Sequence, residues 1–313
     1  MKRGEKLGAK IRQRLLKFNT PRRAVQFLSF VFFSAIIFNI GALPLLLPVL
    51  WTWNLQPNTV GDAYTAIQLM LYDAVFPWLA FASFLIVGIL IGKSMCGWVC
   101  PFGFVQDLVG FVSRKKREIS LRTHNGMIYA KYGILAITLF ISATFAAAKL
   151  SGVGSDYESA LGVFVKAPFT TLSPSEALFS TVPNTVQSFS VRVLEQQSVD
   201  AWSFVSGLPI LLWVQVFMMV GFIVFAVYVP RSWCKYFCPH GAIMAVMNRF
   251  SFIGLRRELT KCAKGECRLC EEACPMRVRI LDLPWEKFSD PECIYCMKCV
   301  DACENKAIKL KYP

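Results

Sequence analysis

Residues 93–103 read KSMCGWVCPFG, and residues 231–241 read RSWCKYFCPHG. Both stretches follow one pattern, in which a basic residue and a serine precede Cys-x-aromatic-apolar-Cys-Pro-x-Gly. The second copy begins 138 residues after the first, and each copy follows an apolar segment and precedes an amphipathic one. The sequence therefore predicts two repeated halves in parallel orientation, related by an axis along the membrane normal.

Four apolar segments are long enough to cross a bilayer, whose hydrocarbon core of about 30 Å needs roughly 20 helical residues. The predicted spans are residues 24–50, 74–92, 127–148 and 208–229. The chain is 55% hydrophobic and 17% charged, whereas about 25% charged residues is usual for a soluble domain. We therefore predict an α-helical integral membrane protein with a four-span bundle, and the composition excludes disordered and ordinary soluble chains.

The basic residues are distributed unevenly along the chain, which has a net charge of +14. If the N-terminus is cytoplasmic, four spans place residues 51–73 and 149–207 outside, where only three basic residues occur: Lys149, Lys166 and Arg192. This is the positive-inside pattern of multi-pass proteins. We predict a cell-membrane protein with both termini in the cytoplasm, a basic N-terminus over residues 1–23, and a membrane domain over residues 24–257.

This distribution also bears on the kind of partner that the charge selects. Basic residues near span ends contact anionic lipid, so we expect membrane lipid, and not nucleic acid, to be the partner. The segment 149–207 is too long for a bare loop, and we expect it to form an extracytoplasmic cover with amphipathic helices.

Residues 258–313 form a hydrophilic, cysteine-rich unit that we predict to be a small cytoplasmic α+β domain. Its cysteines form two runs with the spacings C-x4-C-x2-C-x3-C-P and C-x2-C-x2-C-x3-C. In two-cluster ferredoxins three thiolates of one run bind one 4Fe–4S cluster, and the fourth thiolate reaches the other cluster. The ligands predicted for the first cluster are Cys262, Cys267, Cys270 and Cys303. Those predicted for the second are Cys293, Cys296, Cys299 and Cys274.

This unit resembles the bacterial two-cluster ferredoxins, with two departures. The first gap is four residues where these ferredoxins have two, and Glu304 follows Cys303 where they usually have proline. Neither departure removes a ligand. A pair of zinc sites is the alternative, because C-x2-C pairs also bind zinc. Eight thiolates in two matched runs favour the clusters.

The two C-x3-C-P motifs supply four further thiols, the membrane-edge cysteines Cys96, Cys100, Cys234 and Cys238. Residues i and i+4 share one face of a helix, so each motif offers a pair of thiolates. A proline after the second cysteine is typical of a helix N-terminus, where the helix dipole lowers a thiol pKa. If the halves pack pseudosymmetrically, the four thiols converge on a third redox or metal site. Packing of a helix junction is the structural alternative.

The two histidines, His124 and His240, lie outside the predicted spans. This position excludes a haem held by two histidines within the bilayer. We expect His124 to be solvated, and His240 to pack locally because its counterpart in the first copy is Phe102.

Two C-x3-C-P motifs at span ends, followed by a ferredoxin tail, resemble the NapH/NosR-type membrane iron–sulfur proteins. The resemblance implies electron transfer between the quinone pool, or a cytosolic donor, and a respiratory redox partner, within an oxidoreductase such as a quinol dehydrogenase. It implies quinone and redox protein partners. The cofactors that the cysteines themselves predict are two [4Fe–4S] clusters and a further cluster or metal at the C-x3-C-P motifs, and without a nucleophile–base set we predict no catalytic residue. Related proteins of the CcoG type imply the alternative, an assembly factor that reduces a metal such as copper for an oxidase.

Overall fold

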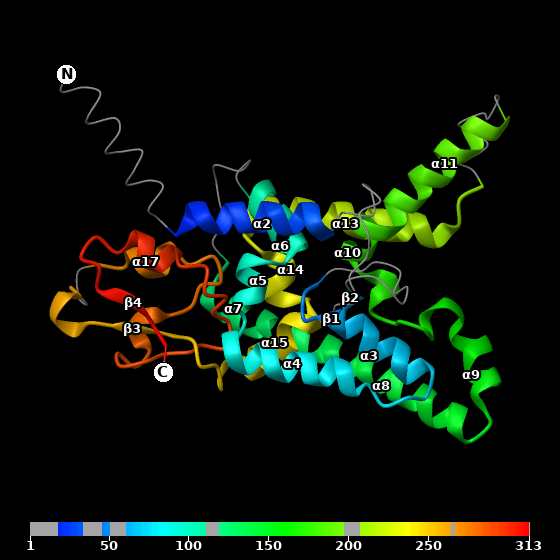
Figure 1. Cartoon of the computed structure of the whole chain (residues 1–313), viewed down its shortest axis with the longest axis horizontal. Coiled ribbons are helices and arrows are strands. Elements are labelled where there is room, and N and C mark those ends of the chain that lie inside the picture. The colour runs from blue at the N-terminus through cyan, green and yellow to red at the C-terminus, as the bar shows by residue number, and fades with distance from the viewer. Residues whose placement is uncertain are drawn as a thin grey trace.

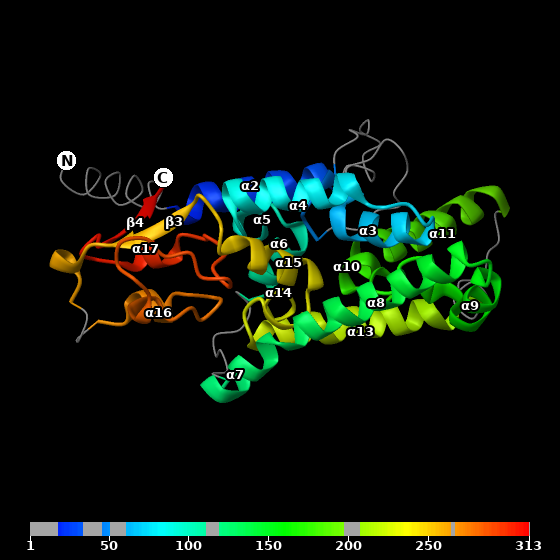
Figure 2. The same cartoon turned by 90° about the horizontal axis from the view of Figure 1, so that it is seen from below.

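The computed structural model describes residues 18–33, 46–50, 61–110, 119–196, 207–263 and 267–312. Helices dominate, and the molecule is elongated (Figure 1). The cysteine-rich unit, with β4 (Ile308–Lys311) and with β3 (Gly254–Arg257) from just before residue 258, lies at one end, and the two strands and the unit are together called the C-terminal unit. The helix α9 (Gly154–Leu161) lies at the other end, and the long helices between them follow the long axis (Figures 1 and 2).

Two helical segments are long and apolar enough to cross a membrane. One is residues 121–150, formed by α7 (Leu121–Ile128) and α8 (Ala130–Leu150), and the other is α13 (Ile210–Tyr228). They coincide with the spans predicted at 127–148 and 208–229. Along α13 large apolar side chains face outward, such as Phe217, which is 78% exposed. By length and composition these helices indicate a membrane protein.

The first predicted span, residues 24–50, is described only in part. It contains most of α2 (Asn19–Phe33) and the two-residue strand β1 (Leu46–Leu47), which pairs in parallel with β2 (Gly61–Asp62). Residues 34–45 lie outside the described part of the chain, as do residues 1–17 of the predicted basic N-terminus. The four-span bundle is therefore not confirmed.

The second predicted span, residues 74–92, contains a shorter helix than expected. The helix α4 (Trp78–Ile91) has 14 residues, because Pro77 precedes its first residue and fixes where it begins. The preceding helix α3 (Ala63–Tyr72) packs against both α4 and α8. This region is a helical hairpin, in which part of the predicted outer segment 51–73 is buried.

Both copies of the repeated sequence adopt the same local structure. In each copy a short helix, a two-residue break and a second helix follow one another; these helices are α5 (Ser94–Trp98) and α6 (Pro101–Val109), then α14 (Ser232–Tyr236) and α15 (Pro239–Asn248). The Cys100 N–H donates to the Met95 carbonyl over 3.0 Å, and the Cys238 N–H donates to the Trp233 carbonyl over 3.0 Å. The sequence repeat is thus a structural repeat.

The C-terminal unit has the small α+β structure that its sequence predicts. Strands β3 and β4 pair antiparallel, with Gly254 opposite Lys311 and Arg257 opposite Ile308. The helices α16 (Leu269–Glu272) and α17 (Lys298–Ala302) pack together beside them. Single 3-10 turns, η5 (Leu259–Lys261) and η6 (Ile280–Asp282), complete the unit. Its apolar core includes Leu255, Met276, Phe288 and Ile294.

The segment 149–207 is largely helical, as expected. After α9 come the 3-10 turns η2 (Gly162–Phe164) and η3 (Thr170–Leu172), the helix α10 (Pro174–Glu176), the π-helical turn η4 (Ala177–Thr181) and α11 (Val182–Gln196). Both α10 and η4 pack against α13. The helix α11 projects from the body of the molecule (Figure 1).

Gly97 in α5 allows the C-terminal unit to approach closely. A Cβ atom added there would lie 2.2 Å from the Ile294 carbonyl oxygen. We expect Gly97→Ala to separate the two backbones and to destabilise their contact by about 1–3 kcal/mol. Thermal unfolding and limited proteolysis in detergent measure this loss. The control is Gly133→Ala, where nothing lies within 4 Å of the added atom; equal stability of the two variants would contradict the close approach.

Candidate metal centre

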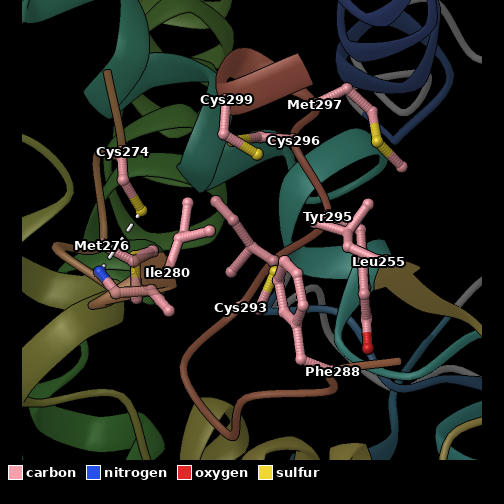
Figure 3. Close-up of a pocket in the computed structure, with 12 residues that line it drawn as sticks. Leu255, Cys274, Met276, Ile280, Phe288, Cys293, Tyr295, Cys296, Met297 and Cys299 are labelled. Atoms are coloured by element: carbon pink, nitrogen blue, oxygen red, sulfur yellow. Dashed lines mark hydrogen bonds between the residues drawn. The ribbon is translucent and has the colours of Figure 1, made fainter. Parts of the chain in front are cut away.

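A pocket in the C-terminal unit is lined by four cysteines, which we name the pocket cysteines: Cys274, Cys293, Cys296 and Cys299 (Figure 3). These are the four residues that the spacing predicts as ligands of the second cluster. The other lining residues are almost all apolar and include Leu255, Met276, Ile280 and Phe288. Cys274 comes from the first run and the other three from the second, so the fold brings the two runs together as expected.

Backbone N–H groups point at the fourth cysteine of each run. The Cys274 Sγ accepts a hydrogen bond from the Val278 N–H over 3.4 Å. The Cys303 Sγ accepts one from the Ala307 N–H over 3.3 Å. The same turn therefore forms after both cysteines, although Glu304 replaces the usual proline in the second run.

The cysteines predicted for the first cluster are less completely surrounded. Cys270 is buried in α16, while Cys262, Cys267 and Cys303 are half-buried. Residues 264–266, in the enlarged gap of the first run, lie outside the described part. The ligand set of the first cluster thus stays a prediction.

Within the described ranges, no three Cys, His, Asp or Glu side chains are close enough together to hold one metal ion. A zinc site needs four ligands in a tetrahedron, with sulfur about 2.3 Å from the ion. Cysteines of both runs line one pocket, which matches the ligand pattern of a two-cluster ferredoxin.

The membrane-edge cysteines are all buried, with exposed fractions between 3% and 8%. In each copy the first cysteine lies within a short helix, and the second is the N-cap of the next helix, which begins with proline. The Cys100 Sγ accepts from the Gly103 N–H over 3.4 Å, and the Cys238 Sγ accepts from the Gly241 N–H over 3.3 Å. The prediction that a helix begins at each Cys-Pro pair is confirmed. The expectation that both thiols of a copy lie on one helix is wrong, because the proline interrupts it.

The two repeats meet at the membrane-edge cysteines. The Gln106 side chain on α6 donates to the Cys234 Sγ over 3.1 Å and accepts from the Trp233 N–H over 3.1 Å. Cys100, Cys234 and Cys238 belong to the apolar core between the long helices, whereas Cys96 packs with the core of the C-terminal unit. Cys96 thus joins the two cores.

Comparisons with known proteins support the prediction of an iron–sulfur protein. A family model described as a 4Fe–4S binding domain matches residues 74–120 and 211–258, which hold the two C-x3-C-P copies. YccM of Escherichia coli is 24% identical over 82% of this chain and 60% of its own length. The ferredoxin-type protein NapH of Haemophilus influenzae is 24% identical over 86% of this chain and 76% of its own length. The chain belongs to the ferredoxin-type 4Fe–4S electron-transport proteins.

Other relatives show how much of the chain, and how much of their own length, the similarity covers. A protein of Methanocaldococcus jannaschii is 26% identical over 72% of this chain and 66% of its own length. The regulatory protein NosR of Stutzerimonas stutzeri matches 65% of this chain but only 22% of its own length. No solved structure matches. The predicted NapH/NosR-type resemblance is confirmed, and iron–sulfur clusters are the cofactor class of this ferredoxin-type protein.

Burial governs the protonation of the membrane-edge thiols in this ferredoxin-type protein. Burial raises the pKa of Cys96 to about 11 and holds the pKa values of Cys100 and Cys238 well above the ordinary thiol value. The N–H groups of Gly103 and Gly241 oppose this change only in part. The expected lowering by a helix N-terminus is therefore wrong, since desolvation is the larger effect. Without a metal these thiols are neutral.

A buried ion pair holds the C-terminal unit against the long helices. The Lys93 ammonium donates to a Glu292 carboxylate oxygen over 3.0 Å, and Lys131 donates to the other oxygen. Asn248 adds a polar link, since its side chain accepts from the Lys93 N–H over 2.9 Å and donates to the Cys293 carbonyl over 3.1 Å. Cys293, a predicted ligand of the second cluster, is thus linked through Asn248 to the segment that follows α4.

A second buried ion pair joins the repeats to α2. Arg231 donates to both oxygens of Asp107, over 2.9 and 2.8 Å, and Arg22 donates to one of them over 2.9 Å. Arg231 also donates to the Cys96 carbonyl over 2.8 Å. Burial alone would raise the Asp107 pKa, but the two guanidinium groups hold it well below its usual range.

Both histidines are buried. His124 is 4% exposed, and its Nδ1 lies 2.8 Å from the Tyr236 hydroxyl. The expectation that His124 is solvated is therefore wrong, because α7 packs against α14. His240 is 1% exposed, as the packing prediction requires, and its Nδ1 lies 3.1 Å from an Asp62 carboxylate oxygen.

Sequence reasoning missed the buried charges of Lys93, Arg231, Asp107 and Glu292. It assigned the basic residues to the positive-inside pattern, although Lys93 and Arg231 are at most 1% exposed. A signal was present, because the two residues occupy the same position in the two repeats. The sequence held no comparable signal for the carboxylates that pair with them.

Glu292 makes the contact between the two units sensitive to acid. Burial disfavours its ionised form, but Lys93 and Lys131 lower its pKa below the ordinary glutamate value. Its contribution to stability is therefore fully present above about pH 4.3 and is lost as the pH falls through the lower folded-state pKa. Glu292→Gln leaves two buried ammonium groups unpaired and should cost about 3–5 kcal/mol at neutral pH.

Unfolding measured between pH 7 and pH 3 checks this expectation. The matched control is Glu286→Gln, which removes an exposed carboxylate from the same unit. We expect Glu292→Gln to be less stable at neutral pH and to lose part of the acid dependence that the control retains. If the two variants unfold alike at every pH, Glu292 does not hold the units together.

Proposed function

We propose that this chain is a membrane-bound iron–sulfur protein that passes electrons between the quinone pool, or a cytosolic donor, and a respiratory redox partner. The observation that carries the proposal is the pocket in which Cys274 meets three cysteines of the other run. This crossing between runs is the ligand pattern of two-cluster ferredoxins. A 4Fe–4S cluster supplies the electron exchange, and the chain supplies thiolates, N–H···S hydrogen bonds and nearby charges.

The eight ligands that we propose follow the two runs. The second cluster binds the pocket cysteines, and the first binds Cys262, Cys267, Cys270 and Cys303. A ferredoxin of Methanothermococcus thermolithotrophicus that is 39% identical over 54 residues supports this assignment.

We also propose that the membrane-edge cysteines hold a further metal centre. Their burial, their arrangement by two equivalent helix pairs, and the match of a 4Fe–4S family model to both copies support this assignment. Cys96 packs in the same core as Cys296, and the Trp98 indole N–H donates to the Tyr295 carbonyl over 2.8 Å. The further centre would therefore extend the electron path from the pocket toward the membrane.

The placement that we propose has residues 258–313 in the cytoplasm and residues 149–207 on the opposite side of the membrane. The C-terminal unit lies at one end of the molecule and α9 at the other, with the long helices α8 and α13 between them (Figure 1). Exposed apolar side chains on α4, α8 and α13 suit contact with lipid.

The alternative is an assembly factor that reduces a metal such as copper at the C-x3-C-P thiols. A thiol that passes an ion to another protein has to be reachable from the surface. The membrane-edge cysteines are at most 8% exposed, so their burial favours a resident centre over a delivery site.

An iron count with low-temperature EPR on anaerobically purified protein tests the proposal. We expect about 12 iron per chain, four from each of three clusters. A variant with serine at all four membrane-edge positions should retain about 8 iron, and Cys274→Ser should lose the signal of the second cluster.

The outcomes separate the alternatives. A parent and a serine variant with the same content of about 8 iron would assign the membrane-edge cysteines to packing or to a different metal. Zinc in place of iron would overturn the electron-transfer function.

A further inference from the structure

Positive charge accumulates where the C-terminal unit meets the repeats. Five cationic side chains there are at most 1% exposed: Arg22, Lys93, Lys131, Arg231 and Lys235. Within the described residues, their ion pairs involve only two carboxylates, Asp107 and Glu292, each shared by two cations. With all five protonated, this buried region has a surplus of three positive charges.

Such a surplus is costly unless a negative group lies nearby. A buried charge loses its hydration, and proteins bury charges only when these are paired or face an ion. The nearest candidates for the negative groups are the cysteines. Each of the five cations lies within electrostatic range of at least one cysteine. The pairs at the pocket cysteines are Arg22 with Cys296, Arg231 with Cys296, and Lys235 with Cys274. The pairs at the membrane-edge cysteines are Lys93 with Cys96, Lys131 with Cys238, and Arg231 with Cys234.

A [4Fe–4S] core with four thiolate ligands is an anion, and reduction adds one more negative charge. Burial disfavours a lone thiolate because nothing balances its charge. When the cluster and the cations are buried together, their opposite charges balance and this cost is removed. Nearby charge is also one of the factors that set the potential of such a cluster. The cations should stabilise the reduced state more than the oxidised one.

Arg22 is a buried cation with two unpaired side-chain donors. It is fully buried and donates through Nη2 to Asp107 over 2.9 Å. Its Nε and Nη1 have no hydrogen-bond partner among the described residues. Two buried donors without acceptors among the described residues are suited to an anionic group that lies beside them.

The helix α2 places Arg22 beside the second run of cysteines. Just before α2, the Phe18 N–H donates to Asp301 on α17 over 3.0 Å, and the Asn19 N–H donates to the same carboxylate over 2.9 Å. One turn after Arg22, the Gln26 side chain donates to the Gly97 carbonyl over 3.0 Å. Arg22 therefore lies between α17, which contains Cys299, and α5, which contains Cys96.

We propose that the buried cations are the counter-charges of the clusters, and that Arg22 is a positioning residue that raises the reduction potential of the cluster at the pocket cysteines. This inference rests on the proposed function, because it needs a cluster at that pocket. In the step concerned one electron would pass from the proposed redox partner to a cluster held by the pocket cysteines, with no bond formed or broken at the cluster. The Arg22 guanidinium offsets the negative charge that the electron brings.

The test compares three variants by redox titration followed by EPR, with an iron count on each. Arg22→Gln removes the charge, Arg22→Lys keeps it, and Arg279→Gln removes an exposed charge, 68% accessible, from the same unit. For Arg22→Gln we expect retained iron and a reduced-to-oxidised ratio about tenfold lower at a given potential, which is about 59 mV for one electron. Arg22→Lys and Arg279→Gln should titrate like the parent.

Asp107→Asn supplies a measurement of opposite sign. It removes a negative charge beside Arg22 and Arg231, so the same cluster should become easier to reduce. A merely structural role for these residues predicts no such reversal. If Arg22→Gln loses its iron, the sign of the shift in reduction potential in Asp107→Asn tests the proposal in its place.

Unchanged potentials in iron-loaded Arg22→Gln would overturn the inference. So would an equal fall in Arg22→Lys, because the charge is still present there, or a fall in Asp107→Asn. A parent protein without iron would instead overturn the proposed function.

Discussion

Two carboxylates hold the buried positive charge on which the contact between the two units depends. Asp107 joins α6 to Arg231 of the second repeat and to Arg22 of α2. Glu292 joins the C-terminal unit to Lys93 of the first repeat and to Lys131 of α8. Each carboxylate connects segments distant in sequence, and removing one would leave two buried cations unpaired, a far greater cost than loss of a surface pair. The arrangement of the helices around the cysteines follows from this constraint.

The two repeats have the same backbone structure, but their side chains make different contacts. The residue after the first cysteine is Gly97 in one copy and Lys235 in the other. Gly97 lets the Ile294 backbone approach, whereas Lys235 adds a buried charge within range of Cys274. Phe102 and His240 differ in the same way, since only the histidine faces a carboxylate. The shared turns place four thiols, and the unshared side chains fit one copy to the C-terminal unit and the other to the helical hairpin.

The sequence was most informative where function restricts spacing. The gaps between cysteines predicted which four cysteines line one pocket. The recurrence of Cys-Pro predicted two equivalent helix starts, because both patterns depend on local geometry. Apolar length predicted the helices within residues 121–150 and at 210–228. Burial was not predictable in this way. The high pKa of Cys96, the contact of His124 with Tyr236 and the pairing of Lys93 with Glu292 all depend on segments that meet only in the folded chain. Basic residues near a span end look alike in sequence whether they are solvated or buried.

Cys96 links the repeats, the buried cations and the C-terminal unit. It is the one membrane-edge cysteine that packs within the core of the C-terminal unit, while the other three pack between the long helices. Its carbonyl accepts from Arg231, and the residue after it contacts Ile294. Arg231 lies within electrostatic range of both Cys234 and Cys296, so a charge at either cysteine would act on the same buried cation, because buried charges are weakly screened. The fold thus places one buried cation within reach of both sets of cysteines, which two separately hydrated domains on a flexible linker would not do.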